Sequence, residues 1–367
     1  MDLTETAAHR ALKHELREWL AAHLDEAPGD VSRTGGREWQ HKLATGGWGA
    51  PRWPVEFGGR GFGPLESAIV QEEMARARAP QSIAVIGVGW AGPAIIAHGS
   101  DDQKRRFLPR ILNGDDVWCQ LFSEPDAGSD LAALRTRAEM HGDRYVVNGQ
   151  KIWTSYAGEA DFGILLARTD PASDRHAGIS CFAMPMRQPG IEIRPIRQMD
   201  GRSTFNQVFF TGAEVPAENL IGGEGGGWPV AISTLMNERT ALSTGAGILW
   251  GDGPTLDDVI RLAQKVGASR GQRQRLAALK VEAEAIRLTG WRMLSGDARA
   301  ASMTKLAADV WGQQVSEVAV ELLGMAGAVE GPWTNGFLFS RALTIGGGTT
   351  EIQKNIVAER VLGLPKS

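Results

Sequence analysis

The sequence predicts an α+β chain of three parts, in which helices come first, a β domain follows and helices return. Apolar residues recur at helical spacing over residues 1–114 and again over residues 226–367. Between them, residues 115–225 break into short apolar or alternating runs separated by turn residues, which is typical of a small β-barrel or sandwich. We therefore expect domain boundaries after residues 114 and 225.

The N-terminal part contains three clear helical segments. Residues 8–24 place their leucines on one face at helical spacing. Residues 64–78 open with Pro64, which is well suited to the first turn of a helix. Residues 101–112 begin with two acidic residues, which complement the positive end of a helix dipole.

The middle part reads as a series of short strands. The expected strands are residues 145–147, 163–167, 179–184, 191–196 and 207–210. Asn148-Gly149 and Pro189-Gly190 are typical turn sequences, so we expect chain reversals there.

The C-terminal part returns to long helices. These are expected at residues 228–245, 272–296 and 301–325. A glycine turn at 346–348 then leads to a last helix near Thr350, where residues 350–353 have the capping-box pattern.

Composition excludes several classes of protein. Hydrophobic content is 43%, charged content is 22% and the net charge is −4, so nothing draws the chain to nucleic acid or to an anionic membrane. Cys119 and Cys181 do not make a disulfide framework, and we expect a reducing, cytoplasmic setting. The longest uncharged run, residues 82–97, is too short to span a bilayer. We expect no metal site.

Four segments, in this order and spacing, resemble the acyl-CoA dehydrogenase family. They are SEPDAGSD at 123–130, NGQKIWTS at 148–155, GWPVAISTLMNER at 227–239 and GGGTTEIQKNIVAERVLG at 346–363. The resemblance implies the acyl-CoA dehydrogenase fold, with a β domain between two helical domains, and FAD as cofactor. It also implies oxidation of an acyl-CoA thioester to the 2-enoyl-CoA, in which a carboxylate removes the α-proton and flavin N5 takes the β-hydride.

The resemblance points to Glu238 as the base. Many family members place a glutamate just before the Gly-Thr of the C-terminal turn, but this chain has Gly347 there. A minority class, similar to isovaleryl-CoA dehydrogenase, carries the base on a helix at the position of Glu238. The alternative is that Glu238 and Arg239 form a solvated charged pair on a helix surface.

Further site residues follow from the same resemblance. Those implied to contact FAD are Phe122, Ser123, Trp153, Thr154, Ser155, Thr349 and Glu351, and those implied to contact substrate are Ser129, Arg239, Gly347 and Gly348. Each has a structural alternative: turn capping for the serines, core packing for Trp153, helix capping for Thr349 and a salt bridge for Arg239.

Two positions depart from the family pattern. Homotetrameric members use an arginine and a glutamine to grip the FAD diphosphate of the neighbouring subunit, and these positions hold Asp257 and Glu321 here. Negative charge beside a diphosphate is unfavourable. The chain is thus similar to the α2β2 acyl-CoA dehydrogenases of actinobacterial steroid breakdown, which implies a related second subunit. The alternative is a homo-oligomer in which a rearranged loop, residues 250–270, supplies Arg261 or Arg270 instead.

Three functions remain to be compared. The first is an acyl-CoA dehydrogenase that passes electrons to an electron-transferring flavoprotein or a similar acceptor. The second is a flavin monooxygenase or oxidase on the same fold, against which Glu238 argues. The third is a non-catalytic subunit that completes a partner's site, against which Ser123, Ser155 and Thr349 argue. A branched or bulky acyl group is favoured, with steroid side-chain, short branched and long-chain acyl-CoA all open.

Overall fold

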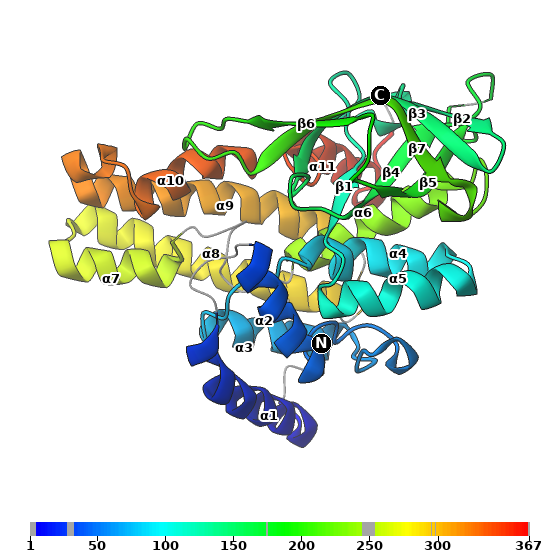
Figure 1. Ribbon diagram of the computed structural model, residues 1–367. Helices are drawn as coiled ribbons and strands as arrows, with labels where there is room; N and C mark the ends of the chain where they lie inside the picture. The colour runs from blue at the N-terminus through cyan, green and yellow to red at the C-terminus, as the bar shows by residue number, and fades with distance from the viewer. Residues whose placement is uncertain are drawn as a thin grey trace. The chain divides into compact units, whose positions relative to one another are not determined.

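The structure is a computed structural model that describes residues 5–27, 33–173, 175–243, 254–294, 296–297 and 299–365. The chain divides into two compact units, which are described separately (Figure 1). The sheet unit comprises residues 21–62 and 80–238, and the helical unit comprises residues 1–20, 63–79 and 239–367. The predicted order of helices, sheet and helices along the chain is confirmed. The exact boundaries after residues 114 and 225 stay a prediction.

The sheet unit is built on one eight-stranded sheet. Its strands are β1 (Trp118–Leu121), β2 (Arg137–His141), β3 (Arg144–Ser155), β4 (Phe162–Arg168), β5 (Ile179–Pro185), β6 (Ile191–Ile196), β7 (Phe205–Pro216) and β8 (Leu220–Ile221). The order is β6-β7-β3-β2-β4-β5-β8, and β1 pairs in parallel with β4. Because β6 and β8 are the ends of this path, the sheet is open, whereas the sequence led us to expect a barrel or sandwich.

Both faces of the sheet are buried at β1, β4 and β5, whereas β2 and β6 carry exposed residues. One face packs against α4 (Gly92–His98), α5 (Asp101–Asn113) and α6 (Gly227–Ser243), as Figure 1 shows. On the other face the sheet curls onto itself, and the ring of Tyr145 in β3 meets the ring of Phe182 in β5 edge-on at 4.9 Å. A further helix, α2 (Arg33–Thr45), is held to α5 by Gln40, whose Nε2 donates to the carbonyl oxygen of Leu112 at 2.6 Å.

The prediction of a turn at Asn148-Gly149 is wrong. Both residues lie inside β3, where the pairing with β7 shifts register between Val147 and Asn148. Gly149 has a φ of 150°, and a Cβ there would lie 2.7 Å from the Thr136 Cα. The dipeptide therefore marks a bulge and a close backbone approach, which use the same residue types as a turn.

The helical unit contains the remaining helices. They are α1 (Ala7–His23, within this unit through Leu20), α3 (Pro64–Arg76), α7 (Leu256–Val266), α8 (Arg270–Leu294), α9 (Ala300–Leu323), α10 (Pro332–Phe339) and α11 (Thr350–Ile356). Its core lies among α7, α8 and α9 and includes Val259, Leu279 and Val315. The helix α1 is tied to α3 because Arg17 donates to both carboxylate oxygens of Glu73, at 2.8 and 2.7 Å.

The expectation of a loop over residues 250–270 is wrong for its described part, since residues 256–266 form α7. Residues 250–253 lie outside the described residues. Thr255 caps α7 through a reciprocal capping box with Asp258. The predicted helices at 8–24, 64–78, 101–112, 272–296 and 301–325 correspond to α1, α3, α5, α8 and α9 within a few residues.

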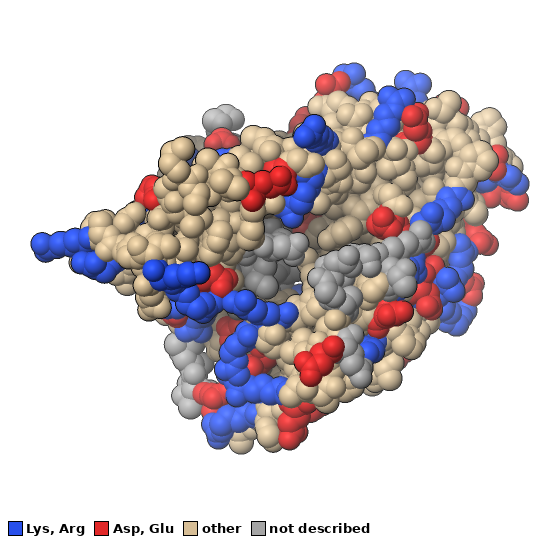
Figure 2. Space-filling view, turned by 60° about the vertical axis from the view of Figure 1, so that its left-hand side comes forward, with Lys and Arg blue, Asp and Glu red and all other residues tan. Residues whose placement is uncertain are grey.

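The surface charges, the cysteines and the helices can be compared with the composition of the chain. On the face that Figure 2 shows, acidic and basic side chains occur side by side. Cys119 and Cys181 are buried free thiols, so they form no disulfide. In the described part of the chain, no helix combines the length and apolarity that crossing a membrane requires, and no group of three metal-ligating side chains is found.

Candidate functional site

The end of β3 turns a large aromatic side chain out of the sheet. The pairing of β3 with β7 shifts between Lys151 and Thr154, so Ile152 and Trp153 together face one residue of β7. Trp153 has a φ of 60°, which is unusual for a bulky residue. Its side chain is 57% exposed and touches Phe205 edge-on, with ring centres 6.1 Å apart. Trp153 is therefore not a core residue, which excludes its structural alternative.

The residues after Trp153 combine a fixed backbone with a buried hydroxyl group. Thr154 pairs with Asn206 in the ladder, and Asn206 Nδ2 donates to the Thr154 carbonyl oxygen at 3.0 Å. The Thr154 Oγ1 is buried and has no hydrogen-bond partner among the residues that the structure describes. Ser155 is half-buried and stands opposite Phe205. Buried hydroxyl groups nearly always have partners, so the Thr154 hydroxyl is a candidate contact for water or a ligand.

The segment after β1 lies directly against this part of β3. Phe122 is buried and Ser123 is half-buried, and the Ser123 carbonyl oxygen accepts a hydrogen bond from the Ile152 amide at 2.9 Å. Ser129 is exposed, at the far end of the same polar segment. The structure thus brings Phe122, Ser123, Trp153, Thr154 and Ser155 together, and we call these five residues the β3 wall.

A buried ion pair supports the β3 wall, and the sequence analysis did not assign it a role. Lys151 has no exposed side-chain surface and donates to Glu124 Oε1 at 2.8 Å and to the Phe122 carbonyl oxygen at 2.9 Å. Burial lowers the pKa of Lys151 to about 8, against the opposing effect of the Glu124 charge. Burial alone raises the pKa of Glu124, but the charge and hydrogen bond of Lys151, together with the hydrogen bonds from Thr136 and Arg135, outweigh this and leave that pKa lowered.

Glu238 lies on the buried face of α6. It follows Val230 and Thr234 at intervals of four residues, and all three side chains are buried. Its side chain is 8% exposed, so Glu238 is not a solvated surface charge. The side chain of Arg239 lies outside the described residues, and its predicted role is untested.

The glycine turn belongs to the helical unit. Gly347 and Gly348 have φ values of 65° and 92°, which favour glycine. Thr349 is the N-cap of α11, and its hydroxyl oxygen accepts from the Ile352 amide at 3.2 Å. The helix is therefore capped by Thr349, and not by a capping box that begins at Thr350. The helix-capping role considered for Thr349 is confirmed. Glu351 is exposed in the first turn of α11.

Both departures from the family pattern are ion-paired within the helical unit. Asp257 lies 3.5 Å from Lys280 Nζ, and both side chains are more than half exposed. Glu321 accepts from Arg275 at 2.8 Å, and Arg275 also reaches Glu317 at 3.1 Å. Asp257 and Glu321 thus neutralise Lys280 and Arg275 of α8, and neither ion pair carries a net positive charge.

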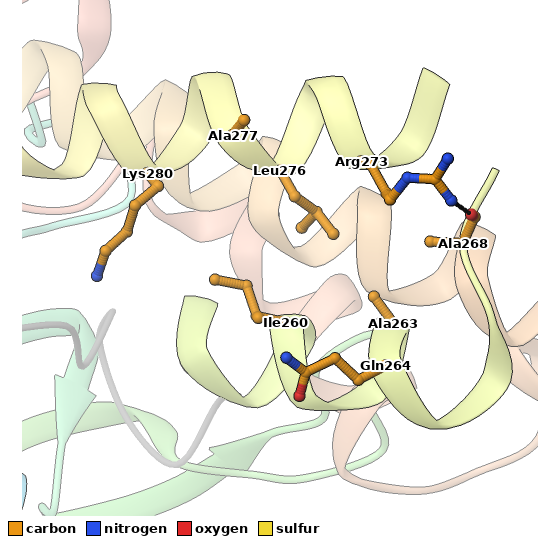
Figure 3. Close-up of a pocket in the computed structure, with 8 residues that line it drawn as sticks. All are labelled: Ile260, Ala263, Gln264, Ala268, Arg273, Leu276, Ala277 and Lys280. Atoms are coloured by element: carbon orange, nitrogen blue, oxygen red, sulfur yellow. Dashed lines mark hydrogen bonds between the residues drawn. The ribbon is translucent and has the colours of Figure 1, made fainter. Parts of the chain in front are cut away.

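A separate pocket of about 400 Å³ lies between α7 and α8 (Figure 3). Ile260 and Ala263 of α7 face Leu276 of α8 across it, and Arg273 at one end donates to the carbonyl oxygen of Ala268. The full lining is Ile260, Ala263, Gln264, Ala268, Arg273, Leu276, Ala277 and Lys280. None of the predicted site residues lines this pocket.

Three family models match the chain almost end to end. They are the N-terminal domain of acyl-CoA dehydrogenase at residues 6–115, the middle domain at residues 119–212 and the C-terminal domain at residues 225–362. Acyl-CoA dehydrogenase IpdE1 of Mycobacterium tuberculosis is 39% identical over 374 residues, covering 96% of this chain and 97% of that protein.

Solved structures give the same result. The Tcur3481-Tcur3483 steroid ACAD has a TM-score of 0.87 at 32% identity, and the ChsE4-ChsE5 complex from Mycobacterium tuberculosis has a TM-score of 0.85 at 32% identity. Each match covers 100% of both chains. The chain belongs to the acyl-CoA dehydrogenase family, whose members are oxidoreductases that act on acyl-CoA.

Proposed function

We propose that the chain oxidises an acyl-CoA thioester to the 2-enoyl-CoA and that Glu238 is the base that removes the α-proton. The burial of Glu238 on α6 is the observation that supports this most. An α-proton is weakly acidic, so its base works best where water is excluded. Gly347 stands where many relatives carry the base, which leaves Glu238 as the matching carboxylate.

We propose that the β3 wall, with Thr349 and Glu351, holds FAD. The fit rests on the exposed ring of Trp153, which offers a flat apolar surface, and on the unpartnered hydroxyl of Thr154. FAD, when bound, supplies the acceptor for the hydride that leaves the β-carbon. Ser129, Arg239, Gly347 and Gly348 are the proposed contacts of the acyl-CoA.

The substitution Glu238→Gln tests the base. Without a carboxylate to take the α-proton, anaerobic bleaching of bound flavin by an acyl-CoA should slow by about a hundredfold or more. The flavin should stay bound, because Glu238 is not among its proposed contacts. Glu139→Gln, on an exposed position of β2, is the matched control and should bleach at the wild-type rate. Unchanged bleaching in Glu238→Gln would remove this residue from its role.

We also propose that the chain works with a related second subunit. Asp257 and Glu321 occupy positions at which an identical neighbour would need an arginine and a glutamine, and Lys280 and Arg275 are engaged by these carboxylates. The names of two related structures, ChsE4-ChsE5 and Tcur3481-Tcur3483, each join two components. An α2β2 assembly would let a different chain supply the missing groups.

We propose a branched or bulky acyl group as the substrate, with a steroid side-chain thioester as the first candidate. Gly347 adds no side chain to the C-terminal turn, and one related structure is named a steroid ACAD. The electron acceptor would be an electron-transferring flavoprotein or a similar protein. A panel of acyl-CoA esters, compared by the rate of anaerobic flavin bleaching in the assembled complex, ranks the candidates. Turnover that requires oxygen would instead favour an oxidase or monooxygenase.

A further inference from the structure

Glu124 and Lys151 connect three segments of the sheet unit through one buried network. Lys151 Nζ reaches Glu124 and the Phe122 carbonyl oxygen. The Glu124 carboxylate also accepts from backbone amides: Oε2 accepts from Arg135 at 2.6 Å, and Oε1 accepts from Thr136 at 2.9 Å. The pair therefore ties the segment after β1 and the segment before β2 to the end of β3.

This network acts where the ladder between β3 and β7 is interrupted. Ile152 and Trp153 lie within the bulge, between the ladder pairs that Lys151 and Thr154 make with β7. The Ile152 amide donates to Ser123 instead of to β7. Besides its contact with the Phe205 ring, Trp153 thus depends for its position on the segment that Lys151 and Glu124 hold in place.

Burial makes the two charges depend on each other. A charged group that loses its partner in a site without water is costly, whereas removal of both charges is often tolerated. The hydrogen bonds of such a pair are short and directional, so they fix backbone positions more tightly than apolar packing does. A pair of this kind is suited to hold a strained bulge in one conformation.

We propose that Glu124 and Lys151 are positioning residues that set the geometry of the β3 wall toward the flavin ring. This inference rests on the proposed function, because it takes the β3 wall as the flavin-facing surface. Neither residue is proposed to touch the flavin. The pair acts through Phe122, Ser123 and the bulge at Trp153.

Because the pair is charged and buried, we expect the affinity for flavin to depend on pH. Burial lowers the pKa of Lys151 to about 8, and Glu124 is the charged group that faces it. Above that pH the ammonium group loses its proton, and the charge-assisted bond to Glu124 is lost with it. Flavin affinity should therefore fall as the pH rises through about 8.

The test compares Lys151→Met, Glu124→Gln and the double variant with the wild-type full-length chain, each assembled with the second subunit. Hydrogen exchange measures the protection of the Arg135, Thr136 and Ile152 amides, which should decrease in Lys151→Met. Titration with FAD should show about tenfold weaker binding and an altered visible circular dichroism of the bound flavin. The double variant removes both buried charges, so it should fold even where one single variant does not, and it should still bind flavin weakly.

The pH profile separates positioning from a general loss of stability. Flavin affinity should fall between pH 7 and pH 9.5 in the wild type and stay low and flat in the double variant. Asp161→Asn is the matched control, because Asp161 bonds Arg37 and the Val117 amide outside the β3 wall. This control should keep the wild-type affinity and pH profile.

The outcomes distinguish the inference from the proposed function. If the wild-type chain takes up no FAD even when assembled with the second subunit, the proposed flavin site is wrong, and the exchange data alone decide on the pair. Wild-type affinity, circular dichroism and amide protection in a folded double variant would overturn the inference. An equal loss of FAD affinity in the double variant and in Asp161→Asn would overturn the inference as well.

Discussion

Thr154 is a residue whose buried hydroxyl group is left unsatisfied in the protein without a ligand. Its buried Oγ1 has no partner in the described part of the chain. A buried hydroxyl without a partner costs about 1–3 kcal/mol relative to one that is satisfied. A ligand that accepts or donates a hydrogen bond at this position removes that cost and gains affinity.

Thr154→Val, which keeps the shape and removes the hydroxyl, tests this. Without flavin, the variant should be as stable as the wild type or more stable by about 1 kcal/mol, because no bond is broken. In the assembled complex its affinity for FAD should fall about fivefold, measured by titration. Thr304→Val is the control: Thr304 is buried and its hydroxyl donates to the Ala300 carbonyl oxygen at 2.8 Å, so this change should destabilise the chain. Undiminished FAD affinity in Thr154→Val would contradict the proposed contact.

Some residues of the site could be predicted and others could not. Ser123, Trp153 and Ser155 sit in two short motifs, and the structure brings these motifs together as expected. The pairing of Lys151 with Glu124 was missed because the residues are 27 positions apart and charged residues are usually at the surface. The one available signal was Lys151 itself, a charged residue in the middle of the NGQKIWTS motif.

At the scale of elements, the periodic segments were predictable and the irregular ones were not. The leucine spacing of α1 and the first-turn proline of α3 place those helices within a few residues. Asn148-Gly149 was misread because a bulge and a turn need the same backbone freedom, and only the partner strand distinguishes them. The helix α7 was missed because glycines, aspartates and arginines around it resemble a loop.

Asp258 takes part in the capping box at the start of α7. Its lowered pKa predicts that the stability of the fold falls in acid. Asp258 accepts from the Thr255 backbone amide at 3.0 Å, from Arg78 at 2.7 Å and from Arg261. Burial raises its pKa, but the hydrogen bonds from Thr255 and Arg261 and the charge of Arg78 outweigh this and lower the pKa to about 2. The ordinary value is 3.8, so the ionised form stabilises the fold by about 2 kcal/mol at neutral pH.

The sign of the pH effect follows from the lowered pKa. The stabilisation is present in full above pH 3.8 and is lost as the pH falls toward 2. Asp258→Asn should thus lower the free energy of unfolding at pH 7 by about 2 kcal/mol, and the deficit should narrow below pH 4. Urea unfolding across this range measures it. Asp257→Asn, at an exposed neighbouring position, should change stability by less than about 0.5 kcal/mol. A deficit in Asp258→Asn that is the same at pH 7 and pH 3 would exclude this explanation.

At the scale of the whole molecule, the question is what completes the proposed flavin site. The family membership and the fold make flavin chemistry the natural expectation. Asp257 and Glu321 lie on helices of the helical unit and are paired with Lys280 and Arg275. An identical neighbour would present these pairs, rather than an arginine, to a diphosphate. The isolated chain should therefore hold well below one FAD per subunit.

Reversal of the two departures tests this directly. In the isolated chain, Asp257→Arg with Glu321→Gln should raise the ratio of FAD to subunit, measured by absorbance after gel filtration. The reason is electrostatic: exchanging a negative for a positive charge beside a diphosphate is worth about 1–4 kcal/mol near a protein surface. Asp257→Asn with Glu321→Gln removes the repulsion without adding a donor, so its ratio should lie between those of the wild type and the arginine variant. Full FAD occupancy in a wild-type homotetramer would rule out the need for a second subunit, because the acidic pairs would then be compatible with the diphosphate of an identical neighbour.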